Sequence, residues 1–129
     1  MNDQPTAEVL LRAVERFLEH DVVPRLDGVP KFHARVAANV VAMVARELEL
    51  EDAQVSAEWD RLGALLHDRA ACPAGREERR RGLLARSESL VQAIERGEAD
   101  GGTFRASVLE HLRLTVADKL AVARPPRQR

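Results

Sequence analysis

Tyrosine is absent from this chain, and cysteine, tryptophan and lysine are rare. The single cysteine, Cys72, excludes a disulfide within the chain. Lys31 and Lys119 are the only lysines, so arginine supplies nearly all of the positive charge, a bias typical of a GC-rich bacterial genome. No stretch reaches the roughly 20 apolar residues that cross a bilayer, because arginines and glutamates interrupt every candidate. We therefore expect no membrane-spanning segment.

Neither sign of charge dominates. Twenty basic and twenty-one acidic side chains leave a net charge of −1, so no overall field attracts nucleic acid or an anionic membrane surface. The one basic cluster, REERRR at residues 76–81, is diluted by two glutamates and reads as the solvated start of a helix. The N-terminal residues lack the features of a signal peptide. We expect a cytoplasmic protein that binds neither nucleic acid nor membranes.

The apolar residues recur at three- and four-residue steps, which indicates helices, and no strand-like alternation is present. With 129 residues, 45% of them hydrophobic, the chain is predicted to be an all-α, single-domain bundle of about five helices over residues 1–123, followed by a disordered tail at 124–129. Changes in the apolar pattern, together with caps, glycines and prolines, give the expected boundaries, which are Thr6 to Val23, 30–50, 51–67, 76–96 and from Thr103 to about residue 120.

Each predicted helix carries an apolar stripe that should face the core. The stripes are Leu10, Val14, Phe17 and Leu18 in the first helix, Phe32, Val36, Val40, Met43 and Val44 in the second, Val55, Trp59, Leu62 and Leu66 in the third, Leu83, Leu84, Leu90, Val91 and Ile94 in the fourth, and Val108, Leu109, Leu112, Val116 and Leu120 in the fifth. The helix at 30–50 is also apolar on its opposite side, where alanines predominate. A helix that is apolar nearly all round is usually covered on all sides, so we expect this one to be central.

Catalytic motifs are missing from the sequence. None of the four histidines has another histidine or an acid three or four residues away, so no metal site is expected. There is no nucleophile elbow and no phosphate-binding glycine loop. We therefore expect no cofactor and no catalytic residues, and the sequence leans toward a protein that is not an enzyme.

Polar side chains on the predicted central helix need an explanation. Arg35, Asn39 and Arg46 fall in one narrow column, and His33 and Glu47 lie among the apolar residues. The column could pair with acids and backbone groups of neighbouring helices and fix the helix register. Alternatively, the two guanidinium groups and the amide could line a cleft and bind a carboxylate or phosphate. His33 and Glu47 would be the acid–base candidates of such a site.

The segments PKFHARVAANVVAMVARELEL, LLRAVERFLEHDVVPRLDG and HLRLTVADKLAVARP resemble a family of small bacterial helical proteins, a domain of unknown function. Members of this family are often encoded beside kinases resembling aminoglycoside and choline phosphotransferases and beside acyl-CoA dehydrogenase-like proteins. The resemblance implies an accessory role with a phosphotransferase-like partner and supplies no catalytic residues. It coincides with the polar column at its positions Phe32, His33, Arg35, Asn39, Arg46 and Glu47.

The sequence and the resemblance therefore leave two functions to be distinguished. The first is a non-catalytic accessory or interaction module for a phosphotransferase-like protein. The second is a small-molecule or acyl-ligand binding protein, or an enzyme that acts on such a ligand, with an anion clamp formed by Arg35, Asn39 and Arg46. A homodimer is expected if helices expose more apolar surface than one chain can cover.

Overall fold

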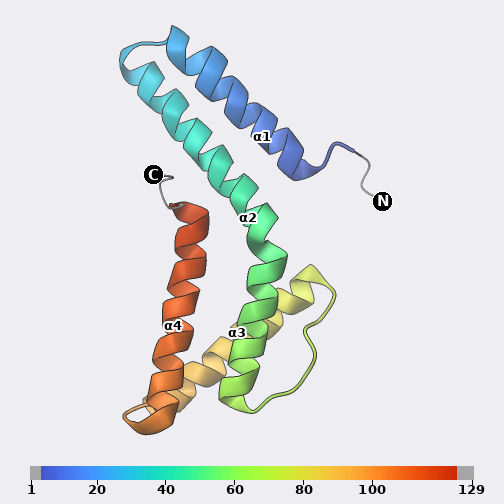
Figure 1. Ribbon diagram of the computed structural model, residues 1–129, viewed down its shortest axis with the longest axis vertical. Coiled ribbons are helices and arrows are strands. Elements are labelled where there is room, and N and C mark those ends of the chain that lie inside the picture. Colours follow the sequence, from blue (N-terminus) through green and yellow to red (C-terminus); the bar gives the residue numbers. More distant parts are fainter. Residues whose placement is uncertain (1–3, 125–129) are drawn as a thin grey trace. The chain divides into compact units, whose positions relative to one another are not determined.

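The computed structural model describes residues 4–124, and that part of the chain is helical without strands. The helices are α1 (Ala7–Phe17), α2 (Gly28–Leu66), α3 (Arg76–Glu95) and α4 (Gly102–Ala123), shown in Figure 1. A π-helical turn (Leu18–Val22) and a 3-10 turn (Val23–Arg25) continue α1. The all-α prediction is confirmed. Apart from Arg124, the expected tail at 124–129 lies outside the described residues.

The number of helices predicted from the sequence is wrong, since the described residues form four α-helices and not about five. The segments expected at 30–50 and 51–67 are one continuous helix of 39 residues. Neither glycine nor proline occurs between Lys31 and Leu62, so nothing in the backbone ends the helix at residue 50. The change in polarity near that residue marks a change of surroundings and not a helix boundary.

The helix ends follow local rules. The Thr6 side chain accepts a hydrogen bond from the Val9 amide, as expected for the cap of α1. Gly97, with φ of +83°, ends α3, because the amides of Gly97 and Glu98 bond to the carbonyls of Ile94 and Ala93 in the pattern of a Schellman motif. The fourth helix begins at Gly102, one residue before the expected cap, Thr103.

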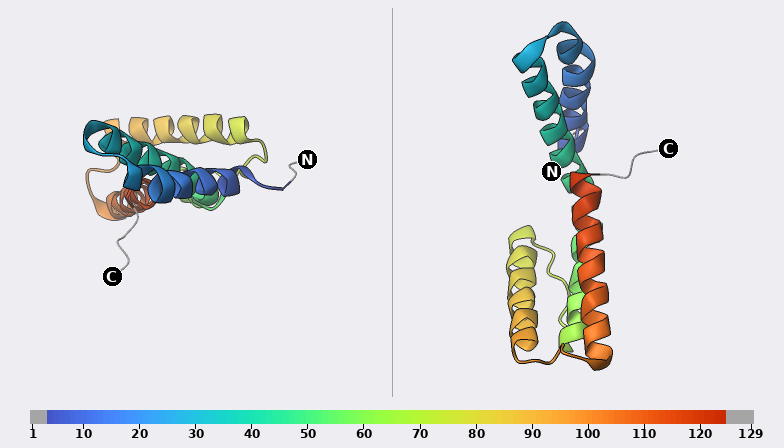
Figure 2. Two further views of the ribbon diagram at one scale, coloured as in Figure 1. Left: turned by 90° about the horizontal axis from the view of Figure 1, so that it is seen from above. Right: turned by 90° about the vertical axis from the view of Figure 1, so that its left-hand side faces the viewer.

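The chain divides into two compact units, residues 1–51 with 121–129 and residues 52–120. In the first unit, α1 and the first half of α2 run side by side in opposite directions, as Figures 1 and 2 show. Ala38, Ala42 and Ala45 of α2 are buried, Ala45 completely. Their small side chains let two helix backbones approach closely. We call this pair of helices the hairpin.

The second unit contains the rest of α2 with α3 and α4. Its core is a cluster of buried aliphatic side chains, Leu62, Leu65, Leu90 and Val108, with Phe104 and Leu83 packed against it. Trp59 is buried as predicted. No helix among residues 4–124 combines the length and the apolar character needed to cross a membrane.

Candidate functional site

The predicted polar column lies on one flank of α2, and only one of its members is engaged. Arg46 is half-buried and its Nε donates a 2.7 Å hydrogen bond to the carbonyl of Val122, which belongs to the same unit. Arg35 and Asn39 are exposed and make no hydrogen bond or ion pair with another described residue. His33 and Glu47 are also exposed, the His33 ring lying 6.0 Å from that of Phe32. The column therefore contributes one contact to the fold, through Arg46. The Arg35 guanidinium and the Asn39 amide have no partner among the described residues and could bind a ligand.

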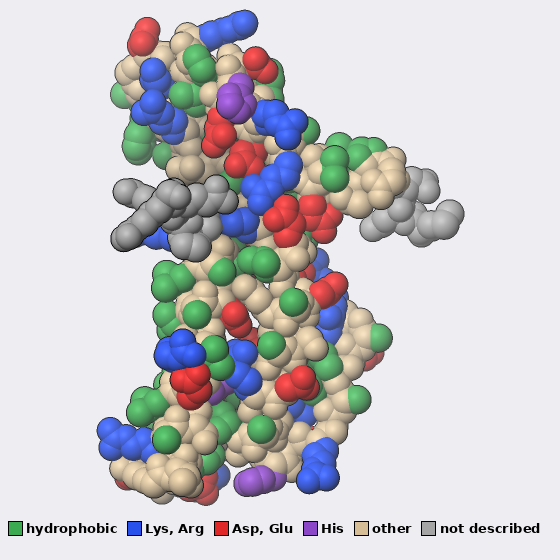
Figure 3. All heavy atoms as spheres, viewed as in Figure 1, with side chains coloured by type: hydrophobic (Ala, Val, Ile, Leu, Met, Phe, Trp, Pro, Cys, Tyr) green, Lys and Arg blue, Asp and Glu red, His purple; other side chains and the backbone are tan. Residues whose placement is uncertain are grey.

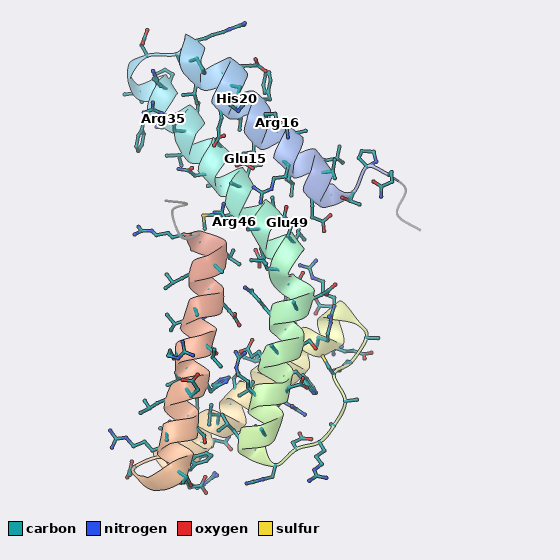
Figure 4. The ribbon with its side chains drawn as sticks, in the orientation of Figure 1. Glu15, Arg16, His20, Arg35, Arg46 and Glu49 are labelled. Atoms are coloured by element: carbon teal, nitrogen blue, oxygen red, sulfur yellow. The ribbon has the colours of Figure 1, made fainter. Side chains whose placement is uncertain are left out.

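An ion cluster on the same flank joins the two helices of the hairpin. Both carboxylate oxygens of Glu49 accept hydrogen bonds from the Arg12 guanidinium, from Nε and Nη2 at 3.0 Å each. Nη1 of Arg12 donates to Glu15 at 2.7 Å. The hydrogen bonds from Arg12 lower the pKa of Glu49. In turn, the hydrogen bonds to Glu49 and, to a smaller extent, to Glu15 raise the pKa of Arg12. Figure 4 shows Glu15 from α1 with Arg46 and Glu49 from α2 at the stretch where the helices lie side by side.

This flank forms a polar surface without an enclosed cavity. A shallow hollow of about 290 Å³ is lined by Arg12, Arg16 and Glu49 among others. Figure 3 shows charged side chains gathered over this side of the hairpin. The ion pairs are about one-third exposed, so they orient α1 on α2 but add little to stability.

Most of the apolar residues predicted to face the core on α1, the first half of α2, α3 and α4 are exposed, and on α3 these are Leu84, Val91 and Ile94. On α1, Phe17 is 54% exposed, and Leu10 and Val14 are also exposed. On α2 the exposed set is the α2 stripe, namely Phe32, Val36, Val40, Met43 and Val44. On α4 it is the α4 stripe, namely Leu109, Leu112, Val116 and Leu120. The expectation that the helix at 30–50 is covered on all sides is not met, because only its alanine side is buried.

The second unit contains a buried cation. The Arg86 guanidinium lies 3.7 Å from the centre of the Trp59 ring, an arrangement that favours a cation–π interaction. Arg86 also donates to the carbonyls of Trp59 and Ala70, at 2.8 and 3.2 Å, and forms an ion pair with Asp68 at 3.4 Å. The indole Nε1 donates to the same Ala70 carbonyl at 2.8 Å. These contacts fasten the loop after α2 to α3, and we interpret Arg86 as structural.

A polar groove between α2 and α4 is the feature that the sequence did not predict. His111 is only 6% exposed, and its Nδ1 accepts a hydrogen bond from Nε of Arg61 at 3.4 Å. Arg61 also reaches Thr115 at 3.4 Å and Asp118 at 3.6 Å. Burial, then the positive charge of Arg61, lowers the pKa of His111, so the ring is held neutral. An adjoining hollow of about 530 Å³ is lined by Arg61, His111, Glu110 and Ser107 together with apolar side chains.

No local pattern identifies that groove, because Arg61 and His111 are fifty positions apart in the sequence. The one detectable signal is that His111 follows Phe104 and Val108 at helical spacing, on the side of α4 that should face the core. The described residues include no cluster of three or more histidine, cysteine or acidic side chains that could hold a metal ion. The groove can offer donors to a polar ligand, and the hairpin flank can offer Arg35 and Asn39.

Residues 24–126 match the sequence profile of a family described as a domain of unknown function (DUF6285), which covers most of the chain. The chain therefore belongs to that family. The matched segment includes α2 and α3 and all of α4, whereas α1 precedes it. Neither the curated proteins nor the solved structures contain a match.

Proposed function

We propose that this member of the DUF6285 family is a non-catalytic accessory module that docks a phosphotransferase-like protein through the α4 stripe. The observation that supports the proposal is the exposure of a complete helical stripe, with Val116 exposed by 55%. Contiguous apolar surface of this kind usually marks a contact with another protein. The resemblance to proteins encoded beside phosphotransferase-like kinases supplies the class of partner, and a bacterial cytoplasm is the setting we propose for both.

The α4 stripe has the spacing of a helix that inserts into a groove. Leu109, Leu112, Val116 and Leu120 follow one another at steps of three, four and four residues, which places them in a single line. The other side of α4 is occupied by its own unit, where Val108 and His111 are buried. Figure 3 shows hydrophobic side chains along the outer edge of α4. One helix can therefore hold its unit together and present four apolar anchors at the same time.

The energy available from this stripe fits a specific but reversible contact. Full burial of a leucine or valine side chain contributes about 1.5–3 kcal/mol, and these four are about half-exposed. Covering them would contribute about 3–6 kcal/mol from this side of the interface. Together with a comparable contribution from the partner, this exceeds the lower estimates of the cost of association, which begin near ~4 kcal/mol.

Co-purification tests the proposal. A phosphotransferase-like kinase encoded in the same genome is co-expressed with the tagged chain and with two variants, Leu112→Glu and Ala117→Glu. Leu112 belongs to the α4 stripe, whereas Ala117 is exposed on the same helix outside it. We expect the wild type and Ala117→Glu to retain the kinase and Leu112→Glu to bind at least tenfold more weakly, about 1.4 kcal/mol. Absence of binding by the wild type at micromolar concentrations contradicts the proposal, as does equal binding by both variants.

The alternative function is a small-molecule or acyl-ligand site that uses Arg35, Asn39 and Arg46. The open donors of Arg35 and Asn39 favour it, while the bond from Arg46 to the Val122 carbonyl leaves that guanidinium only partly available. In this alternative, Arg35→Ala stays folded and loses binding of an anionic probe such as inorganic phosphate or octanoate, measured by titration calorimetry. Calorimetric heats that are unchanged in Arg35→Ala exclude the clamp.

A further inference from the structure

The hairpin has one polar and one apolar side. At roughly 100° per residue, Leu10, Val14 and Phe17 lie on the flank of α1 opposite Arg12. On α2, Val44 lies about 140–160° around the helix from Asn39 and Arg46, and Val40 lies about 100–120° from them. Arg12 bonds to Glu49, and Arg46 is close enough to Glu49 to help lower its pKa, so the polar flanks of both helices meet on one side. The two apolar flanks must then meet on the other side.

That other side is an apolar surface two helices wide, which we call the hairpin face. It consists of five exposed side chains, Leu10, Val14, Phe17, Val40 and Val44. None of these five carries charge, although the exposed Glu47 projects within about 20° of Val40 on the same helix. The rest of the α2 stripe, Phe32, Val36 and Met43, borders it and is exposed as well.

We infer that the hairpin face is covered by the hairpin face of a second copy of this chain, so that two hairpins form a four-helix bundle around a two-fold axis. Two antiparallel helices with a short connection are half of such a bundle, and a largely apolar surface of equal width on both copies can pair with itself. The single-helix α4 stripe fits a groove, whereas a two-helix face fits another pair of helices. The inference concerns a different surface from the proposed partner contact and does not depend on it.

The apolar area approaches, at its upper value, the area that a homodimer interface of standard size buries. A fully buried aliphatic or aromatic side chain removes roughly 60–120 Å² from water, and about half of each of these eight side chains is still exposed. Covering them would bury roughly 250–500 Å² of apolar surface per copy. An interface of standard size buries about 800 Å² per partner, of which about two-thirds is apolar in homodimers. The second copy also accounts for the sequence of α2, since a helix that is apolar on opposite sides would then be covered on both.

Sedimentation velocity of the full chain at concentrations from about 1 to 100 μM tests the inference, at the scale on which weak dimers dissociate. We expect the wild type to be a dimer and Val14→Glu to be a monomer. The control is Arg16→Glu, an exposed position two residues away on α1 and outside the hairpin face, which should remain a dimer. Because Val14 is exposed within one chain, the variant should keep its helical circular dichroism, and Val40→Glu provides the same test from α2.

A wild type that is monomeric at 100 μM overturns the inference, and so does a Val14→Glu variant that dimerises as the wild type does. Leu112→Glu should remain a dimer, because the α4 stripe lies outside the hairpin face. A dimer that does not bind the kinase contradicts only the proposed function. A wild-type monomer that binds the kinase contradicts only the dimer. If Val14→Glu loses kinase binding and Leu112→Glu keeps it, the hairpin face binds the partner instead of a second copy.

Discussion

Replacing Gly82 by alanine should destabilise the protein, although alanine is the better helix former. In an exposed helix interior this substitution adds about 1 kcal/mol of stability. Here the new Cβ would lie 2.6 Å from Cζ3 and 2.8 Å from Cη2 of Trp59. The ring cannot easily move aside, since its Nε1 is bonded to the Ala70 carbonyl and the Arg86 guanidinium is stacked on its face.

The expected magnitude is the difference between these two effects. Carbon atoms in contact are normally ~3.5–4.0 Å apart, so the overlap exceeds half an ångström at two ring atoms. Forcing an extra methyl group into a packed site costs about 1–3 kcal/mol. Two close contacts place the cost in the upper part of this range, about 2–3 kcal/mol. After subtraction of the gain in helix propensity, the free energy of unfolding should fall by about 1–2 kcal/mol. The unfavourable intrinsic choice of glycine in α3 is then explained by the position of Trp59.

Urea unfolding followed by circular dichroism measures this effect. Gly82→Ala is compared in the wild type and in a Trp59→Leu background, where the smaller side chain leaves room for the new Cβ and the substitution should become neutral or stabilising. Gly101→Ala is the matched control, because no atom lies within 4 Å of a Cβ built there. Stabilisation by Gly82→Ala in the wild type, or the same effect in both backgrounds, would show that the new Cβ does not clash with the Trp59 ring.

Three further predictions follow from the same contacts. Arg86→Met should lower the free energy of unfolding by about 2–3 kcal/mol, because it leaves the Trp59 and Ala70 carbonyls without their charged donor. Arg80→Met, at an exposed position, should have almost no effect. Chemical denaturation of both variants measures the difference. The pKa of His111 is lowered in the folded state, so below about pH 6.5 the unfolded chain binds a proton that the folded chain does not. The free energy of unfolding should therefore fall as the pH is lowered from about 7 to about 5. If His111→Gln shows the same dependence of this free energy on pH, the prediction is contradicted. Thr6→Ala removes the cap of α1 and should cost about 0.5–1 kcal/mol in a thermal melt, while a cost of zero would show that the 3.4 Å bond to Val9 is not formed in solution.

The local features of this fold are readable from the sequence. The cap at Thr6, the stop at Gly97 and the burial of Trp59 follow from residue type and helical spacing, and all three are confirmed. The continuity of α2 was missed because a change in polarity near residue 50 was interpreted as a boundary, although no helix-breaking residue occurs there. Backbone breakers determine where a helix ends, whereas polarity reports its surroundings.

The side on which each helix packs could not be predicted in the same way. Periodicity identified the apolar stripes, and Trp59, Leu62 and Val108 are buried as predicted. The other stripe residues of α1, the first half of α2 and α4 are mostly exposed, whereas the alanines of α2 and His111 of α4 are buried. A stripe indicates that a helix will be covered without indicating by which molecule. The polar column lies on one flank of α2, and whether it binds a ligand stays a prediction. The Arg61–His111 groove depends on a contact between distant segments, which a single sequence does not reveal.

The central claim is that the apolar stripes predicted to be core are covered by other polypeptides, and carbene footprinting of the purified protein tests it most directly. At a concentration where the chain is fully associated, we expect Val14, Phe17 and Val40 to be protected from the diazirine reagent, and Leu112 and Val116 to react until the phosphotransferase-like partner is added. Equal labelling of all five side chains at every concentration, with and without the partner, would contradict it.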